Sequence, residues 1–447
     1  MPTSNPAEES GNIAKFKISS NFKDYAVDLS AGVQEFNYYE SVLSNVATAT
    51  AIMIESGFQS DGSSTTAKES TLDGLPIRGG ERTDITIADA NGFELTYPGG
   101  MYVNRVRDSV PGTQQDFYSL DFASKEFFSN DLTRVMKRYE GKISDHVRSI
   151  LTEVMEYEEE LDIDTTALDY NFMGNTRKPF YVLTWLASRA VPEMSSEGGG
   201  NVIGGTAGYL FYQTREGYHF KSIDKLFTQD TVKKYIHNNA TQSNLPDGYD
   251  AKILSYTIDS DIDLGNNLML GQYNNTSLFF DFYAFNYVNR PFSLAEEQED
   301  KITSAGTTPI TETIAEEFTA SPSRLMTHVL DVGTLPAGTD MISQLEHWKD
   351  QPAEATYKVA DTMVQGIMRY NQLFTVKTNI TIPGDFSLKA GDLVQCDFAE
   401  LKGGESQEVN VETGGIYMIA NVCHRITPDS TYTSLGLVRD SFGRKTQ

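Results

Sequence analysis

Hydrophobic and polar residues alternate along the C-terminal part of the chain with the period of a β-strand. In residues 374–382, Phe, Val, Thr, Ile and Ile occupy every second position, and Thr, Lys, Asn and Thr lie between them. This pattern predicts a strand with one buried face. Turn sequences follow at residues 383–385 and 389–392, before the apolar pair Leu393 and Val394. Short strands joined by tight turns are typical of a small antiparallel β-barrel.

A second β-region is predicted near the N-terminus, between residues 33 and 122. The sequence Asp-Ala-Asn-Gly at residues 89–92 is a strong candidate for a hairpin turn. An insert rich in Ser, Thr and Gly within residues 57–75 is expected to form a loop. The predicted strands span residues 51–55, 84–88, 101–106 and 117–122.

The pattern changes to a helical period after the N-terminal β-region. Apolar residues recur at helical spacing from Leu132 to Val154, with Asn130 or Asp131 as the N-cap. Gly141 is expected to divide this stretch into two short helices. Further predicted elements are helices at 181–190 and 353–370, a β-hairpin at 209–220 that turns at 215–217, and strands at 253–258 and 278–288.

These patterns predict an α+β fold that is mainly β, and its 447 residues are enough for several domains. Two barrel-like β-regions near the ends of the chain suggest a duplicated architecture. The expected organisation is a disordered N-terminal arm (1–13), a first β-barrel domain (14–125), a helical connector with a small α/β domain (126–250), strands contributing to a second barrel (251–295), a loop or insertion (296–350), and a helix with the C-terminal β-barrel domain (351–447).

The composition is that of a folded protein with a strong negative charge. Hydrophobic residues make up 39% of the chain, and 62 acidic residues against 36 Lys and Arg give a formal charge of −26. Such a charge disfavours nonspecific adhesion to nucleic acid. It suits a surface past which DNA slides without binding, although ordinary solubility is the simpler interpretation.

Cysteine usage and hydropathy narrow the protein class further. The two cysteines, Cys396 and Cys423, fall in predicted strands and are expected to be buried free thiols, since a disulfide framework needs more cysteines in a smaller chain. No apolar run approaches the ~18 residues of a membrane span. The polar, acidic N-terminus does not resemble a signal peptide, so we expect the protein to be made and assembled in a cytoplasm.

No motif of the sequence predicts a catalytic, cofactor or metal site. The Gly-rich stretch 198–208 lacks the Gly-Lys-Ser/Thr ending of a phosphate loop. Residues 259–265 resemble the start of a calcium loop, but the glycine falls one place late, position twelve is Leu270, and both flanks are predicted strands. The six histidines are scattered without metal-ligand spacing. Pairs of carboxylates will occur by chance among 62 acidic residues, so they do not indicate a glycosidase.

Three stretches of the chain carry a family resemblance. The first comprises residues 382–385, 390–392, 415–417, 421–424, 427–428 and 437–443; the second is RVMKRYEGKISDHVRSILTEV and the third is GYLFYQTREGYHFKSIDKLF. Together, in their order along the chain, they resemble the central baseplate hub protein of contractile-tailed bacteriophages. That family is related in fold to the hub part of type VI secretion spike proteins.

The resemblance implies a fold of two similar antiparallel β-barrels joined by smaller mixed α/β domains, with three copies closing into a ring of pseudo-sixfold symmetry. Such a hub adapts the sixfold tail tube to the threefold spike, and DNA passes through its lumen. The implied partners are further copies of the chain, a spike protein, tail tube or tube-initiator proteins, the tape-measure protein and other baseplate proteins, with DNA only in transit. The implied place is the tail baseplate of a virion assembled in the host cytoplasm. No enzymatic activity or cofactor is implied, and an acidic lumen would fit the net charge.

Seven residues are predicted to be structural positions of the C-terminal barrel. Gly384 and Gly391, like Gly415, suit turns that need a positive φ. The carboxylates of Asp392 and Asp440 can accept turn N–H groups. The seven residues are Gly384, Gly391, Asp392, Tyr417, His424, Tyr432 and Asp440.

Two alternative functions remain open at this point. A type VI-like secretion spike hub usually continues into a spike β-helix, whereas this sequence stops at Gln447. A glycan-binding or glycan-cleaving virion protein would need a cleft, with paired carboxylates for cleavage.

Overall fold

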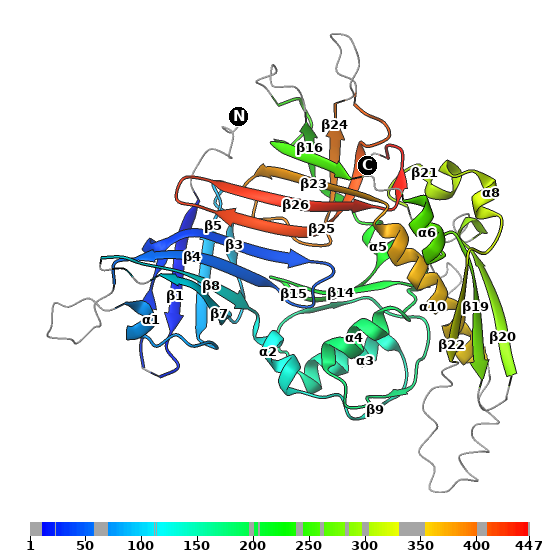
Figure 1. The fold of residues 1–447 in the computed structure, drawn as a ribbon, viewed down its shortest axis with the longest axis horizontal. Helices are drawn as coiled ribbons and strands as arrows, with labels where there is room; N and C mark the ends of the chain where they lie inside the picture. The colour runs from blue at the N-terminus through cyan, green and yellow to red at the C-terminus, as the bar shows by residue number, and fades with distance from the viewer. Residues whose placement is uncertain are drawn as a thin grey trace, which may run out of the picture.

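A computed structural model shows a large curved sheet, an α/β layer beneath it and a peripheral lobe at one side (Figure 1). Strands dominate the secondary structure, so the fold is α+β and mainly β, as predicted. Among the described residues, no helix is both long and apolar enough to cross a membrane. The structure describes residues 11–22, 24–57, 70–110, 112, 114–195, 201–203, 206–237, 245–259, 263–281, 286–296, 304–329, 354–399 and 409–445.

The N-terminal β-region forms the first part of the large sheet. Its aromatic core residues Phe16, Phe36 and Phe122 pack edge to face. The predicted hairpin turn is confirmed, because Asp89 Oδ1 accepts the N–H groups of residues 91 and 93 and Gly92 has a φ of +83°. The elements are β1 (Asn12–Ser19), β2 (Ala26–Asp28), a 3-10 helix η2 (Ser30–Gly32), β3 (Val33–Ser41), β4 (Thr48–Glu55), α1 (Thr71–Gly74), β5 (Arg82–Ala88), β6 (Glu94–Thr96), β7 (Met101–Val110) and β8 (Asp116–Ala123).

The C-terminal β-region forms the second part of the same sheet. The alternation predicted for residues 374–382 is confirmed from Val376 onward, since Val376, Thr378 and Ile380 are buried while Lys377 and Asn379 are exposed. It does not hold at Thr375, which was expected on the polar face and is buried. The elements are β16 (Thr231–His237), β17 (Ala251–Lys252), β18 (Ser255–Asp259), β23 (Val376–Pro383), β24 (Leu393–Phe398), β25 (Gly415–Ile426), β26 (Thr431–Arg439) and β27 (Ser441–Phe442), the last of which pairs with β21 (Thr308–Pro309) outside the large sheet.

Strand β25 joins the two β-regions into one sheet of 15 strands. Its C-terminal half pairs with β3, from Asn421 opposite Ser41 to Ile426 opposite Phe36, and its other edge pairs with β26. Figure 1 shows β25 and β26 lying beside β3 and β4. The two regions predicted as separate barrels therefore share a continuous sheet, and the pairings among the described strands close neither region into a barrel.

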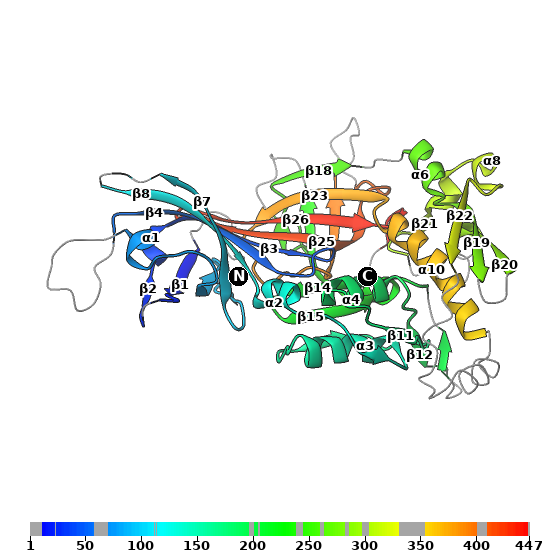
Figure 2. The same cartoon turned by 60° about the horizontal axis from the view of Figure 1, so that its bottom comes forward.

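The α/β layer lies beneath the sheet (Figure 2) and has its own core, which includes Val147, Leu183 and Phe211. The hairpin predicted at 209–220 is confirmed as β14 and β15, with its turn at residues 215–216. The elements are α2 (Lys125–Leu132), β9 (Arg138–Tyr139), α3 (Ile143–Ser149), a π-helical turn η3 (Ile150–Val154), β10 (Leu161–Ile163), β11 (Phe172–Met173), α4 (Pro179–Ala187), β12 (Glu193–Ser195), β13 (Asn201–Ile203), β14 (Tyr209–Thr214), β15 (Gly217–Ser222) and α5 (Ile223–Leu226).

The helix predicted to start near Leu132 is wrong in its first part. Helix α2 ends at Leu132, and the chain then runs extended because the N–H of Val135 donates to the carbonyl oxygen of Arg177 at 2.9 Å. The break predicted at Gly141 is confirmed: this residue has a φ of +110°, and α3 begins at Ile143.

The peripheral lobe consists of a three-stranded sheet and the long helix predicted at 353–370. Helix α10 packs on this sheet through Val364, which contacts the cluster of Phe279 and Met326. The elements are α6 (Leu264–Leu270), β19 (Asn274–Asp281), β20 (Asn286–Ser293), a 3-10 helix η4 (Ile310–Thr313), α8 (Glu316–Thr319), β22 (Arg324–Val329) and α10 (Glu354–Leu373).

Three sequence predictions need correction here. Residues 251–295 do not all join the second β-region, because β19 and β20 pair with β22 in a separate sheet. Strand β22 lies within residues 296–350, which were expected to form a loop or insertion. The arm predicted for residues 1–13 does not include Asn12 and Ile13, which pair with Ala88 and Ile87; residues 1–10 lie outside the described residues.

The calcium-loop candidate has a different flank from the one predicted. A helix, α6, begins within the candidate at Leu264, where a strand was expected to follow, and Asp263 caps this helix by accepting the N–H of Asn266 at 2.9 Å. Residues 260–262 of the candidate lie outside the described residues, as do most of the insert within 57–75 and residues 198–200 and 204–205 of the Gly-rich stretch.

Candidate functional site: the C-terminal turn and the open face of the sheet

His424 lies at the centre of the contact between the two β-regions. It projects from β25 into the interior, where its ring lies between Tyr38 of β3 and Phe386 of the turn after β23. Its Nε2 is 3.1 Å from the carbonyl oxygen of Leu388, and its Nδ1 is 3.1 Å from the hydroxyl of Thr433. Burial lowers the pKa of His424 to about 3. The ring is therefore neutral, and because a carbonyl only accepts, Nε2 carries the proton.

The turn segment 384–392 is held by charged side chains from distant parts of the chain. The guanidinium of Arg215, at the β14–β15 turn, donates to the carbonyl oxygens of Phe386 and Ser387 at 2.7 Å and of Leu388 at 3.1 Å. The carboxylate of Asp89, in the N-terminal region, accepts the N–H of Phe386 at 3.0 Å. The turn segment thus connects the N-terminal region, the α/β layer and the C-terminal region.

Glu40 of β3 also binds the turn segment. Its carboxylate accepts the N–H of Arg215 at 2.8 Å, the N–H of Ala390 at 3.1 Å and the hydroxyl of Tyr38 at 3.0 Å. Burial raises the pKa of this carboxyl above its usual value. A buried carboxyl with three donors fixes the relative position of the groups that it joins.

The predicted structural residues of the turn have different roles in detail. Gly391 has the expected positive φ, +93°, and a side chain there would collide with the hydroxyl of Tyr212. The positive φ expected for Gly384 is wrong; this glycine is needed because its backbone approaches Thr431 too closely for a Cβ atom. Asp392 accepts the N–H of Lys389 at 3.1 Å, and burial raises its pKa to about 6.

The remaining predicted residues lie apart from the turn segment. The buried Tyr417 donates from its hydroxyl to the carbonyl of Thr413, and the guanidinium carbon of Arg439 lies 5.0 Å from the centre of its ring. Tyr432 is half-buried on β26, where it pairs with Arg425 and Pro383 across the strands. The structure therefore brings Gly384, Gly391, Asp392 and His424 together, and leaves Tyr417, Tyr432 and Asp440 elsewhere.

The contacts of His424, Arg215 and Glu40 with the turn segment form one buried junction of the molecule. Asp440 belongs to a second one. Arg369 of α10 donates to Asp440 Oδ2 at 2.5 Å and to Asp224 Oδ1 at 3.0 Å. All three side chains are almost completely buried. Asp440 Oδ1 also accepts the N–H of Ala305 at 2.9 Å, so the predicted acceptor role is seen. The ion pairs attach α10 and the peripheral lobe to the body of the molecule.

Sequence reasoning missed the partners in both junctions. Arg215 and Glu40 have no local signal, because their partners lie far away in the sequence. Arg369 had a weak local signal in the sequence, because it is a charged residue between the apolar Met368 and Tyr370 of a predicted helix.

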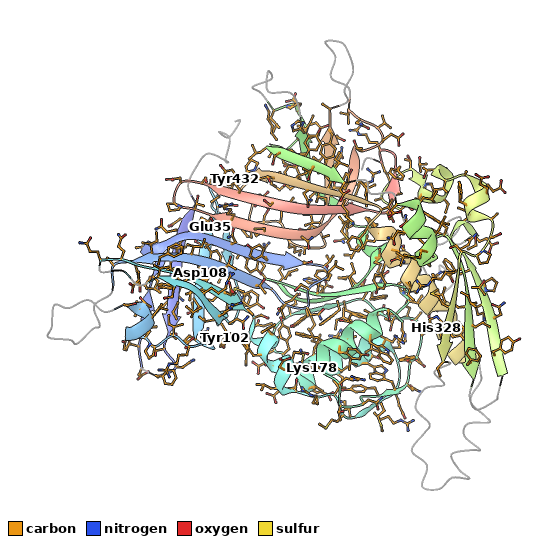
Figure 3. All side chains as sticks on the ribbon, in the orientation of Figure 1. Glu35, Tyr102, Asp108, Lys178, His328 and Tyr432 are labelled. Carbon is orange, nitrogen blue, oxygen red and sulfur yellow. The ribbon has the colours of Figure 1, made fainter. Side chains whose placement is uncertain are left out.

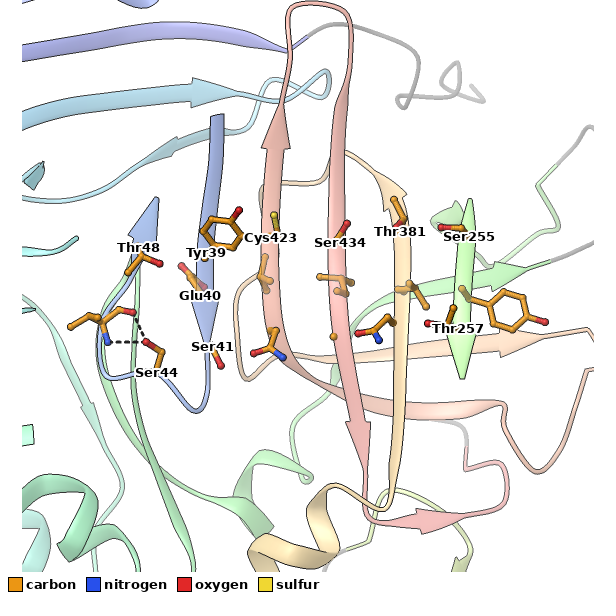
Figure 4. Close-up of a pocket in the computed structure, with 18 residues that line it drawn as sticks. Tyr39, Glu40, Ser41, Ser44, Thr48, Ser255, Thr257, Thr381, Cys423 and Ser434 are labelled. Carbon is orange, nitrogen blue, oxygen red and sulfur yellow. Dashed lines mark hydrogen bonds between the residues drawn. The ribbon is translucent and has the colours of Figure 1, made fainter. Parts of the chain in front are cut away.

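The second feature is the open face, defined as the solvent-facing side of β4, β3, β25, β26, β23 and β18. A groove of about 600 Å³ crosses it (Figure 4). Strand pairing aligns its residues in rows that run across the sheet. One row contains Thr48, Tyr39, Cys423, Ser434, Thr381 and Ser255, and the next contains Ser41, Asn421, Gly436, Asn379 and Thr257.

Charges on the open face are few and balanced. Arg425 and Glu35 form an ion pair of 2.7 Å beside the first row. Lys377 and Asp259 lie directly opposite one another on β23 and β18. The two rows themselves contain no ionisable group other than the phenol of Tyr39 and the thiol of Cys423, and burial raises the pKa of that thiol to about 11. The open face is therefore polar and close to neutral on a chain of −26.

The groove does not have the chemistry of a glycosidase. Among the described residues that line it, the one carboxylate is that of Glu40, which is bound by Arg215 and Ala390. Cleavage of a glycosidic bond needs two carboxylates across the site. Likewise, no group of three or more His, Cys, Asp or Glu residues among the described part of the chain could hold a metal ion.

Comparison with known proteins now gives the fold a context. No family model and no curated protein sequence matches the chain. Among solved structures, the 43 kDa tail protein of prophage MuSo2 from Shewanella oneidensis matches with a TM-score of 0.51 at 9% identity, over 95% of this chain and 98% of that chain. The chain has the fold of a phage tail protein. The resemblance to tail hub proteins indicated by the sequence motifs is therefore confirmed at the level of the fold.

Two other similar structures have lower scores. The tail protein from Neisseria meningitidis MC58 has a TM-score of 0.47 at 12% identity, over 95% of this chain and 96% of that chain. The Escherichia coli c3393 protein, described as a type VI secretion component with similarity to the T4 tail proteins gp27 and gp5, has a TM-score of 0.44 at 9% identity, over 96% and 79%.

Proposed function

We propose that this chain is a structural protein of a contractile phage tail and forms the central hub of the baseplate. Three copies would close into a ring, in which each contributes its two β-regions, which include residues 14–125 and 351–447, with the α/β segment 126–250 between them in the sequence. The ring would adapt a sixfold tail tube to a threefold spike. The tail-protein fold and the three sequence stretches that resemble hub proteins support this proposal.

The open face is the observation that carries the proposal. It extends without a break over both β-regions because β25 pairs with β3. In a ring, a continuous face of this kind can line a channel. DNA phosphates bind unpaired cations and are repelled by an excess of carboxylates. A wall of small neutral side chains neither binds nor repels the phosphates, so DNA can move along it.

If the open face lines the channel, the lumen is neutral and not acidic as the net charge had suggested. The cations and carboxylates near the two rows occur as pairs, Arg425 with Glu35 and Lys377 opposite Asp259. The excess negative charge of the chain therefore belongs to other surfaces. We propose a neutral channel wall in place of the acidic one.

The proposed partners follow from the hub role. They are further copies of the chain, the spike protein, tail tube or tube-initiator proteins, the tape-measure protein and other baseplate proteins, with DNA only in transit. The proposed place is the tail baseplate of a virion assembled in the host cytoplasm. The function is geometric, because it depends on large complementary interfaces.

The test is the mass of the purified chain by light scattering, combined with electron microscopy of the same sample. A trimeric ring whose hole is lined by the open face supports the proposal. A chain that remains monomeric alone and when co-expressed with its cognate spike protein contradicts it. A ring with the open face on its outside contradicts the assignment of the channel wall.

A further inference from the structure

Large apolar side chains are exposed together on the α/β layer, away from both junctions and from the open face. The exposed fractions are 84% for Leu132, 65% for Met136, 51% for Met173 and 56% for Tyr181. Together these four residues are called the apolar patch. Such clusters on an otherwise polar surface commonly mark sites of interaction. Methionine and tyrosine suit this role, because Met adapts its shape and Tyr combines an apolar ring with a polar end.

Backbone contacts place the members of the apolar patch side by side. The segment after α2 pairs with the segment before α4, since the N–H of Thr176 donates to the carbonyl of Val135 at 3.0 Å. Met173 lies opposite Arg138 in the short β9–β11 ladder. Lys178, labelled in Figure 3, forms an ion pair of 2.6 Å with Asp131 at the end of α2. These contacts hold the patch on a fixed scaffold.

A hollow of about 460 Å³ lies on one side of the patch, where Tyr181 and Met173 line it. The rings of Phe172 and Trp185 also line it, and their centroids are 5.4 Å apart. The guanidinium carbon of Arg177 lies 5.2 Å from the centre of the Tyr181 ring. The volume and the aromatic lining fit one or two large apolar side chains.

Cationic residues outnumber carboxylates on the segments that carry the apolar patch, although the chain as a whole is strongly negative. Five cationic residues lie here with three carboxylates, and the carboxylates are already paired with three of the cations: Lys178 with Asp131, Arg138 with Glu140 and Lys137 with Glu153. The other two, Arg134 and Arg177, form no ion pair with a described residue. Of these two, Arg177 lines the hollow, and Arg134 lies next to Val135, whose backbone pairs with that of Arg177. The two arginines therefore give this part of the surface a positive charge.

We propose that the apolar patch and its hollow are a docking site for an acidic segment of another protein. The segment would insert a large apolar side chain into the hollow and place carboxylates against Arg134 and Arg177. A carboxylate that pairs with an arginine at the edge of an apolar contact gives specificity and a faster association rate. The patch has four main side chains, which is small compared with the 20–30 residues a side that typical stable interfaces use. This size favours capture of a segment over contact between two copies of the chain.

The test uses the full-length chain and a labelled peptide with Trp-Leu at its centre and two glutamates on each side. Binding is measured by fluorescence anisotropy. We expect Arg177→Glu, and separately the double variant M173S/Y181S, to weaken binding at least about tenfold, since each change removes one part of the site. The matched controls, Lys17→Glu and Leu43→Ser, change an exposed cation and an exposed apolar residue elsewhere and should not alter binding. Circular dichroism verifies that each variant is folded.

Several results would overturn the proposal. One is absence of binding by the wild-type chain, and another is equal binding of a peptide in which lysines replace the glutamates. A third is equal loss in the controls and in the patch variants. If the patch variants changed the mass of the protein by light scattering, the patch would be a contact between copies instead. The proposal does not depend on the hub function, because peptide binding is measured whatever the oligomeric state.

Discussion

The ring of His424 lies parallel to that of Tyr38, with 6.3 Å between centroids and 5° between planes, across the strand pair that joins the two β-regions. The two rings are also held by hydrogen bonds, that of Tyr38 to Glu40 and that of His424 to the carbonyl oxygen of Leu388. Both regions are therefore fixed by the same small group of side chains. Substitutions in this group are expected to affect the whole sheet.

The first prediction concerns the variant His424→Phe. Phenylalanine keeps a ring between Tyr38 and Phe386 but loses the donor to Leu388, so the free energy of unfolding should fall by about 2 kcal/mol at neutral pH. The pKa of His424 is lowered from 6.5 to about 3 by burial. The stabilising effect of a neutral histidine is thus complete above pH 6.5 and is lost as the pH falls toward 3.

The measurement is urea unfolding of both proteins at several pH values. The difference between wild type and variant should narrow by about 1.4 kcal/mol per unit below pH 6.5, pass through zero near pH 5 and reverse below it, so that the variant is the more stable protein at pH 4. Arg425→Gln, on the same strand but at an exposed ion pair, should cost less than about 1 kcal/mol at each pH. A difference that stays constant from pH 7 to pH 4 would contradict the assignment of a buried neutral ring.

The second prediction concerns Asp392→Asn. Burial raises the pKa of Asp392 from 3.8 to about 6, so its ionisation costs stability above pH 6 and not below 3.8. Asparagine can still accept the N–H of Lys389 without this cost. The variant should be more stable than wild type at pH 8, by as much as about 3 kcal/mol, and equal to it near pH 4. Thermal unfolding at the two pH values tests this, with Asp429→Asn, at an exposed aspartate, as the control without effect.

The third prediction concerns the buried ion pairs of α10. Arg369→Met leaves the carboxylates of Asp224 and Asp440 buried without their cation, and it should destabilise the protein by about 3–5 kcal/mol. The triple variant R369M/D224N/D440N removes the uncompensated charges and should recover most of this loss. Denaturant unfolding measures both, and limited proteolysis shows whether the peripheral lobe detaches first. Equal instability of the single and triple variants would show that the charges are not the cause.

The fourth prediction separates two causes of glycine requirement. Gly391 and Gly92 have similar positive φ angles, +93° and +83°. A Cβ atom at Gly391 meets the hydroxyl of Tyr212, whereas nothing lies within 4 Å of one at Gly92. Gly92→Ala should therefore cost about 1 kcal/mol, from backbone strain alone, and Gly391→Ala clearly more, from strain and collision. Thermal unfolding compares them, and equal losses would rule out the collision.

The limits of sequence prediction in this chain have physical causes. The strand predicted at 374–382 is observed at 376–383, and the hairpin predicted at 209–220 is observed at 209–222, because their signals, alternation and a turn, are local. The pairing of β25 with β3 was missed because residues that meet there are far apart in the sequence. The contacts of Arg215 and Arg369 were missed for the same reason. The helix predicted from Leu132 failed because a tertiary pairing with Arg177 overrides the local helical pattern.

The fifth prediction tests the channel wall. Ser434 and Thr381 are neighbours in one row of the open face, and neither is charged. The double variant S434K/T381K adds two unpaired cations to this row, so the assembled protein should bind DNA in a manner that weakens as salt increases, whereas wild type should not bind. Virions that carry the variant should eject DNA more slowly. The control Thr327→Lys places one exposed cation on β22 of the peripheral lobe and should leave the ejection rate unchanged. If the double variant bound no DNA and ejected it at the normal rate, the open face would not be the wall that DNA passes.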